Sequence, residues 1–162
     1  MTALDITCVL LDKLGFLRNT IVPNVRDGVF FPTWPYVLHE CDVLCVTKTG
    51  YGIEYEIKVS IADIKKDQAK THQHQHHYLR QTYFVIPGKL YEKAEKMIPP
   101  AFGIYTVDHY PEIGKFTLTK KRKAPVNKNA LKWTDSLRAQ LYRLGTLRLP
   151  GLYKKIQKLT AK

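Results

Sequence analysis

The sequence predicts an α/β domain in which a mixed β-sheet is flanked by helices. Apolar residues at helical spacing near the N-terminus are followed by short segments with period-two alternation. Further helical and strand-like segments then alternate along the chain, an order typical of α/β proteins. At 162 residues the chain is long enough for one domain with a substantial core. It has no run of about 18 apolar residues, so no membrane span or membrane partner is expected.

Ten elements are expected from the apolar pattern and its punctuation. In chain order they are helix 4–17, strand 19–25, strand 36–46, strand 51–59, helix 61–80, strand 82–86, helix 89–98, strand 102–107, strand 116–119 and helix 135–144.

The first half of this order follows from three local signals. Helix 4–17 repeats apolar residues every three or four positions and reaches Gly15 near its end. Strands 36–46 and 51–59 are separated by a short polar turn, so we expect them to form a β-hairpin. Ser60 is a favoured N-cap residue, which predicts that a helix starts immediately after the hairpin.

In the second half of the chain, proline and glycine mark most of the boundaries between the expected elements. Strand 82–86 is rich in aromatic and β-branched residues and ends at Pro87-Gly88. Pro99-Pro100 stops the helix that follows, and Thr134 can cap the last one. Residues 120–129 are expected to be an extended basic segment. We therefore divide the chain into a core, 1–119, and a basic C-terminal helical extension, 120–162, packed on the core or following it.

Positive charge is concentrated at the C-terminal end. Residues 1–112 hold 12 Lys and Arg against 13 Asp and Glu, whereas residues 113–162 hold 14 against one. Such asymmetry is typical of a polyanion binder, because Lys and Arg neutralise phosphates. The alternative is a solvated tail without a partner. The nucleic-acid contacts expected here are Lys120, Lys121, Arg122, Lys123, Lys128, Arg138 and Arg143, with Lys70 and His72 as further candidates.

Acidic side chains are expected on one face of the predicted hairpin. Glu40 and Asp42 point the same way on the first strand, and Glu54, Glu56 and Lys58 share one face of the second. The hairpin places Asp42 near Glu56. Two carboxylates are suitable ligands for Mg²⁺, and a neighbouring lysine can orient a water and offset developing negative charge. The alternative is an ordinary wet strand face with a cross-strand ion pair.

The region from Glu40 to Val107 resembles the PD-(D/E)xK nuclease superfamily, nearest to its MmcB-like DNA-repair members. The matching segments are Asp42-Val43-Leu44, Glu56-Ile57-Lys58-Val59-Ser60, Ala62-Asp63-Ile64-Lys65-Lys66-Asp67, Tyr83-Phe84-Val85-Ile86-Pro87 and Gly103-Ile104-Tyr105.

The resemblance implies a restriction-endonuclease-like fold and Mg²⁺-dependent hydrolysis of DNA, with Mn²⁺ as a substitute. Asp42 and Glu56 would be the metal ligands and Lys58 the catalytic lysine. The chain departs from the pattern at Cys41, where a proline precedes the first acid in many members. The first helix offers only Asp5 and Asp12 as a third carboxylate, so Glu40 is the substitute candidate.

The resemblance also implies a role in DNA repair or recombination in a bacterium, or in phage DNA processing. A homodimer is compatible with cutting both strands. Three cysteines, an odd number, fit a reducing cytoplasm of a bacterial or phage-infected cell. Two alternatives remain: a non-cleaving nucleic-acid-binding module on the same fold, and a basic RNA-associated protein.

The segment 72–77 contains four histidines. His72 and His76 would lie one turn apart on a helix and could bind Zn²⁺ with Cys41 or Cys45. The intervening glutamines and the lack of a Cys-x-x-Cys pair favour an exposed polar stretch instead. Asp63 and Asp67 are expected to stabilise the start of their helix or to pair with nearby lysines.

Overall fold

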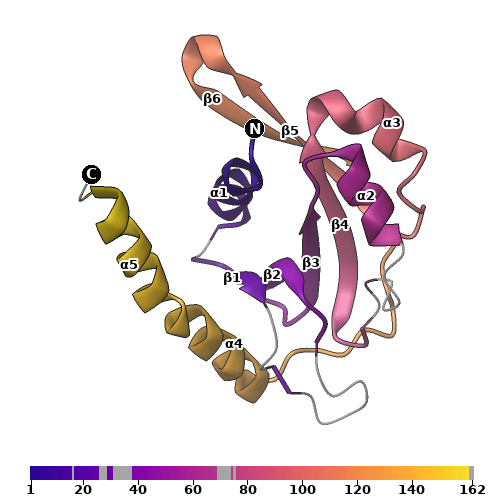
Figure 1. Cartoon of the computed structure of the whole chain (residues 1–162). Coiled ribbons are helices and arrows are strands. Elements are labelled where there is room, and N and C mark those ends of the chain that lie inside the picture. The colour runs from indigo at the N-terminus through magenta and orange to yellow at the C-terminus, as the bar shows by residue number, and fades with distance from the viewer. Residues whose placement is uncertain (16, 26–28, 31–37, 69–73, 75, 161–162) are drawn as a thin grey trace.

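The computed structural model describes the whole chain except residues 16, 26–28, 31–37, 69–73, 75 and 161–162 (Figure 1). Its elements are α1 (Ala3–Leu14), β1 (Thr20–Val25), β2 (Cys41–Val46), β3 (Gly52–Ile57), α2 (Ile61–Gln68), β4 (Leu79–Pro87), η1 (Gly88–Leu90), α3 (Tyr91–Glu95), β5 (Gly103–Tyr110), η2 (Pro111–Ile113), β6 (Lys115–Arg122), α4 (Asp135–Leu147) and α5 (Leu149–Thr160).

The six strands form one sheet in chain order, β1 to β6. The pairs β1–β2, β2–β3 and β5–β6 are antiparallel, while β3–β4 and β4–β5 are parallel. Parallel neighbours need a crossover, which α2 provides between β3 and β4 and α3 provides between β4 and β5. The α/β class with a mixed sheet flanked by helices is therefore confirmed.

Helix α1 covers one face of the sheet (Figure 1). Ile6 and Leu10 are completely buried there and pack in a cluster with Val43, Tyr55 and Val85. Full burial of each aliphatic side chain contributes about 1.5–3 kcal/mol. Thr2 caps α1 through a reciprocal capping box with Asp5, so Asp5 serves the helix terminus.

The opposite face carries two separate apolar clusters. Near β1 and β2, Leu44 and Val46 pack with residues of α4, including Leu137 and Leu141. Near β4 and β5, Phe84 and Ile86 pack with α2 and α3. Strand β3 lies between these clusters in the sheet order, and its side chains on this face are Glu54, Glu56 and, just beyond the strand, Lys58. Polar groups thus occupy the space between two apolar clusters.

The predicted hairpin is confirmed, but the long helix predicted at 61–80 is wrong. Strands β2 and β3 pair antiparallel with Val43 opposite Tyr55, and residues 47–50 turn the chain. Ser60 caps α2, whose Asp63 amide donates to the Ser60 hydroxyl at 3.1 Å. Helix α2 ends at Gln68, and strand β4 has begun by Leu79, where it pairs with the start of β3. Residues 69–73 and 75 of the predicted helix lie outside the described residues.

The C-terminal part is joined to the core more closely than its charge suggests. The predicted domain boundary after residue 119 falls inside β6, because Lys120 and Arg122 still pair with β5. Trp133 is buried in the cluster with Leu44, and its indole donates to the Tyr78 carbonyl at 2.9 Å. Helix α5 was not predicted. No described helix is long and apolar enough to cross a bilayer.

Candidate functional site

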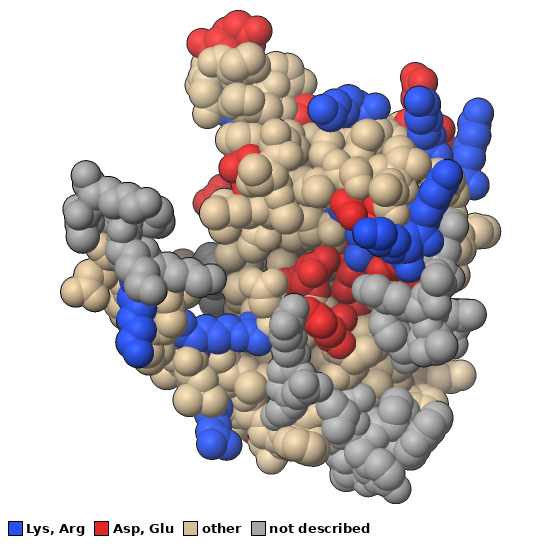
Figure 2. All heavy atoms as spheres, in the orientation of Figure 1, with Lys and Arg blue, Asp and Glu red and all other residues tan. Residues whose placement is uncertain are grey.

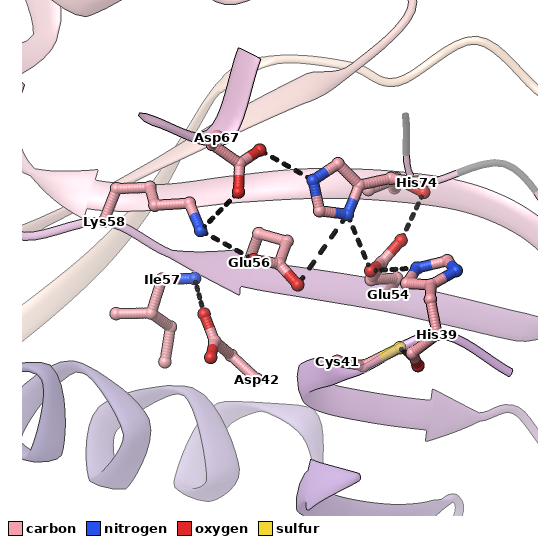
Figure 3. A network of polar contacts seen from close by, with 10 residues as sticks. His39, Cys41, Asp42, Glu54, Glu56, Ile57, Lys58, Asp67 and His74 are labelled. Atoms are coloured by element: carbon pink, nitrogen blue, oxygen red, sulfur yellow. Dashed lines mark hydrogen bonds and ion pairs between the residues drawn. The ribbon is translucent and has the colours of Figure 1, made fainter. Parts of the chain in front are cut away.

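Glu54, Glu56 and Lys58 form the centre of a buried polar network (Figure 3). The three residues are 0%, 2% and 8% exposed, respectively. Period-two alternation along β3 brings them to the same face, as predicted. Burying three ionisable groups on one strand costs folding free energy unless each group is paired. The partners of each group therefore determine its charge state and the role it can take.

Lys58 is held between two carboxylates from different elements. Its ammonium lies 2.7 Å from Glu56 Oε2 and 2.8 Å from Asp67 Oδ1. Burial alone would lower the pKa of Lys58, but the charges of Glu56 and Asp67 outweigh it and raise that pKa. Lys58 is therefore cationic at neutral pH. Asp67 comes from the end of α2 and is itself buried, and it pairs with Lys58, a lysine outside its own helix.

Glu54 is held between two histidines. Its Oε1 lies 2.6 Å from His39 Nε2 and 2.9 Å from His74 Nδ1, and its Oε2 accepts a hydrogen bond from the Thr82 hydroxyl at 3.1 Å. Burial alone would raise the pKa of Glu54, but the hydrogen bonds from His39 and His74 lower it to about 2. Glu54 is thus an ionised carboxylate in the interior.

His74 links the two halves of the network. Its Nε2 lies 2.6 Å from Asp67 Oδ2, and its Nδ1 lies 3.8 Å from Glu56 Oε1 in addition to the Glu54 contact. Its backbone adopts a φ of +52°, a left-handed conformation that is uncommon for a residue other than glycine. Burial would lower the pKa of His74, but the bonds to Asp67 and Glu54 raise it to about 9.

The surroundings of Glu56 raise the pKa of its carboxyl group. Burial, followed by the neighbouring charges of Glu54 and Asp42, raises the pKa of Glu56 to about 7, even though Lys58 and His74 act in the opposite direction. Burial is the largest cause, and the charges of Glu54 and Asp42 add to it. A divalent cation beside Glu56 would offset those charges, which is the first physical indication of a metal site.

Asp42 lies beside this cluster and is only half-buried. Its Oδ2 accepts a hydrogen bond from the backbone amide of Ile57 at 2.8 Å, so β2 and β3 are tied together where the predicted catalytic residues meet. Glu40, the substitute third ligand, is exposed before the start of β2. The carboxylate that does lie beside Glu56 is Glu54.

Among the described residues, two groups of side chains could each hold a metal ion. One consists of Glu54, Glu56 and His74, and the other of His39, Cys41 and Glu54. Within each group the potential ligand atoms all lie within 4.8 Å of one another. Neither group includes Asp42 or Glu40. Of the predicted ligands Asp42, Glu56 and Glu40, these groups contain only Glu56, and the residue common to both groups is Glu54.

Sequence reasoning missed four members of the network: His39, Glu54 as a ligand, Asp67 and His74. The signal available for Glu54 was its position two residues before Glu56 on the same strand face. His39 was visible as a neighbour of the acidic pair. Nothing in helical or strand periodicity singles out His74 among the histidines of its segment. His76 stacks near Tyr78 instead, and His72 lies outside the described residues.

The predicted nucleic-acid contacts are dispersed. Arg122 donates to the carbonyls of Phe102, Ile98 and Pro99. Arg138 donates to the Thr47 carbonyl at 3.2 Å. Both guanidinium groups therefore stabilise the fold. Lys120 lies over the Tyr105 ring on the α1 side of the sheet, whereas Lys121 lies near Tyr91. The residues Lys123, Lys128 and Arg143 are exposed, and Lys70 and His72 lie outside the described residues.

Other lysines lie closer to the buried network. Helices α2 and α3 are on the same face of the sheet as Glu56, and Figure 2 shows Lys and Arg side chains gathered over them, beside acidic side chains in the middle of this view. The exposed lysines of these helices are Lys65, Lys66 and Lys93, and Lys89 in η1 and Lys96 directly after α3 are also exposed. Sequence reasoning missed them because their local charge is balanced by nearby acids.

Comparison with known proteins supports the fold but indicates no activity. No protein-family model matches the chain. No curated protein matches it either. Among solved structures, the chain is similar to the SPO1766 protein of Silicibacter pomeroyi, which is described as of unknown function. The TM-score is 0.56 at 14% identity, covering 97% of this chain and 92% of the other. The likeness therefore extends over the whole fold, including the C-terminal part.

The metal-free protein is expected to lose stability as the pH rises from about 6.5 through 9. The folded-state pKa of His74, about 9, lies above its ordinary value of 6.5. Its contribution is therefore complete below 6.5 and is lost as the pH rises through 9. A shift of this size corresponds to a contribution on the order of 3 kcal/mol. Urea unfolding in chelator across this range measures it.

His74→Asn should flatten that pH dependence, whereas His77→Asn, at an exposed position, should leave it unchanged. An equally steep loss of stability in the His74 variant would contradict the assigned network.

Proposed function

We propose that this protein is a metal-dependent phosphodiester hydrolase that acts on DNA. The observation that carries the proposal is the convergence of Glu56 and Lys58 with two further buried carboxylates, Glu54 and Asp67, next to the half-buried Asp42. A strand that merely faced solvent would not bury these charges. Their burial is costly, and functional sites are where proteins retain such arrangements.

The residues present fit a divalent cation. Glu56 and Glu54 offer oxygen ligands, His74 can contribute a nitrogen, and Asp42 approaches Glu56 from the neighbouring strand. When bound, Mg²⁺ or Mn²⁺ supplies Lewis-acid activation of the scissile phosphate and of a water. The raised pKa of Glu56 supports this role, because a cation there offsets the mutual repulsion of the carboxylates.

Lys58 is the group that would act on the reacting atoms. In the metal-free protein its ammonium neutralises Glu56 and Asp67. With a cation held by Glu56, Lys58 would be needed less for that neutralisation and would orient the attacking water and stabilise the negative charge that develops on the phosphate. Asp67 keeps the ammonium next to the reaction centre throughout. Lysine suits this task as a compact, strongly hydrated point charge.

The architecture supports the restriction-endonuclease-like assignment. The segment α1–β1–β2–β3–α2–β4 places the acid-bearing hairpin in the middle of a mixed sheet, with helices on both faces. Asp42 lies at the start of β2 and Glu56 near the end of β3, so an antiparallel pair brings them together. The β3–α2–β4 crossover then delivers Asp67 to Lys58. This is the arrangement that the resemblance to PD-(D/E)xK nucleases implies.

Two alternatives use the same fold. One is a nucleic-acid-binding module that does not cut, and the other is a basic RNA-associated protein in which the polar network only stabilises the interior. The buried carboxylates argue against both, since a binding surface for phosphates has no use for an anionic cluster beneath it.

Cleavage assays separate these functions. The chelator-treated full chain is incubated with a supercoiled plasmid, a single-stranded DNA oligomer and an RNA oligomer, with Mg²⁺, Mn²⁺ or neither. The proposal predicts metal-dependent cutting of at least one DNA. Retention of DNA without cutting under either metal supports the binding module, and preferred retention of RNA without cutting supports the RNA-associated protein; either result overturns the proposal.

DNA binding should depend more on α2 than on the basic tract at 120–123. Lys65 and Lys66 lie on the face of the sheet that holds Lys58, whereas Lys120 lies on the opposite face. Because each phosphate contact contributes about 0.9 to the slope of log K against log[salt], replacing both α2 lysines with Gln should flatten the slope by up to about 1.8. Fluorescence anisotropy with Lys120→Gln/Lys123→Gln as the matched control measures this. A larger effect in the control would place the DNA along β6.

A further inference from the structure

A second group of ligands lies on the side of Glu54 away from Lys58 (Figure 3). His39 Nε2, the Cys41 thiol and a Glu54 oxygen all fall within 4.8 Å of one another. His74 lies beside this group, because its Nδ1 contacts the Glu54 oxygen that His39 contacts. His39, Cys41 and Glu54 therefore surround one point with nitrogen, sulfur and oxygen donors.

The spacing of these three donors is compatible with one metal ion, since their ligand atoms lie within 4.8 Å of one another. His39 Nε2 lies 2.6 Å from Glu54 Oε1. Ligands bound to one ion at about 2.0–2.1 Å in a tetrahedron are separated by about 3.3 Å. Insertion of an ion therefore requires these two ligand atoms to move apart by about 0.7 Å, and the imidazole proton that now occupies the space is released.

The surroundings hold the donors in place. His74 Nδ1 contacts Glu54 Oε1, and the Thr82 hydroxyl donates to Glu54 Oε2. Hydrogen bonds to a ligating carboxylate are a usual support of a protein metal site, since they fix the orientation of that ligand. The left-handed backbone of His74 gives independent support, because such conformations persist where the surrounding structure requires them.

We propose that His39, Cys41 and Glu54 bind a transition-metal ion of the Zn²⁺ type and leave its fourth position open. The donor set selects the ion: imidazole and thiolate suit Zn²⁺ and Co²⁺, whereas Mg²⁺ takes oxygen ligands and avoids thiolate. This site goes beyond the proposed hydrolysis and does not depend on it. It uses none of the predicted pair His72 and His76, and it joins the entry of β2 to the middle of β3.

Titration with Co²⁺ tests the site because a cobalt–thiolate bond gives a charge-transfer absorption band in the near ultraviolet. Every sample is the full chain carrying Cys8→Ser, which removes the exposed thiol. Cys45→Ser is the matched control for Cys41→Ser, since both thiols are buried but Cys45 packs on the α1 side of the sheet.

The expected result is one Co²⁺ per chain with the charge-transfer band in the parent and in Cys45→Ser. Cys41→Ser loses the band, His39→Asn weakens Co²⁺ binding more than about 10-fold, and equimolar Zn²⁺ but not excess Mg²⁺ removes the Co²⁺ spectrum. Absence of the band in the parent, or its persistence in Cys41→Ser, overturns the proposal. If Cys41→Ser does not fold, His39→Asn and the parent spectrum decide.

The result of the Co²⁺ titration can be told apart from the result of the DNA cleavage assays. Stoichiometric Co²⁺ bound through Cys41 together with no DNA cleavage leaves the site standing and removes the hydrolase. Cleavage with Mg²⁺ together with no cobalt–thiolate band leaves the hydrolase standing and removes the Zn²⁺-type site.

Discussion

Glu56→Gln is expected to reduce metal-dependent DNA cleavage at least about 100-fold while the protein stays folded. The substitution removes an anionic ligand of the divalent cation from the place where phosphate charge develops, and loss of one such electrostatic contribution typically costs a factor of about 10²–10³ in rate. The fold should tolerate it, because the pKa of Glu56 is raised to about 7 and the carboxyl is already partly protonated near neutrality. Plasmid nicking rates at saturating Mg²⁺ are the measurement.

Glu92→Gln is the matched control, since Glu92 is an exposed residue in the first turn of α3. It should cut DNA at the rate of the unmodified protein. If Glu56→Gln cuts equally fast while its circular dichroism spectrum is unchanged, Glu56 has no part in the reaction.

Lys58→Met is expected to lower the free energy of unfolding of the metal-free protein by about 3–5 kcal/mol. The reason is that Glu56 and Asp67 lose the buried cation that each contacts within 3 Å, and removal of one partner of a buried ion pair leaves an uncompensated charge. The loss should be greater at pH 8 than at pH 6, because protonation of Glu56 relieves part of the penalty at the lower pH. Urea denaturation at both pH values measures it.

Lys65→Met provides the comparison, because Lys65 is exposed on α2 and such surface changes usually stay within about 0.5 kcal/mol. In a Glu56→Gln background the cost of Lys58→Met should shrink, as expected for two residues in direct contact. Equal losses for Lys58→Met in both backgrounds would mean that the two side chains are not coupled.

The hairpin and its acidic face could be predicted because they depend on local signals. Alternation of apolar and polar residues fixes which side chains share a face, and the turn at 47–50 sets the β2–β3 pairing. From that pairing alone Asp42 falls near Glu56, and Lys58 falls beside Glu56. The helix N-cap at Ser60 was predictable for the same reason.

The rest of the site depends on contacts distant in sequence. Asp67 has the spacing of an ordinary helix-surface acid, and only the path of α2 across the sheet brings it to Lys58. His74 reaches Glu54 through a left-handed backbone conformation that no periodicity predicts. The predicted helix 61–80 was wrong for a related reason: β4 has to begin beside the start of β3, and that requirement is tertiary.

Charge counts alone also misplaced part of the basic surface. Arg122 and Arg138 belong to the positive C-terminal segment, yet each donates to backbone carbonyls of the core. Backbone carbonyls after α3 and in the 47–50 turn accept from these guanidinium groups, because arginine reaches across several ångströms with five N–H donors. Net charge in the sequence therefore does not identify which basic residues are available to a partner.

The proposed hydrolysis depends most on a divalent cation that occupies the carboxylate cluster beside Lys58. An anomalous difference map from a crystal soaked in Mn²⁺ tests this directly. The predicted result is a peak at about 2.2 Å from the Glu56 carboxylate, with Lys58 moved off Glu56 but still beside Asp67. A map without a peak there, in which Lys58 and His74 keep their contacts with Glu56, would contradict it.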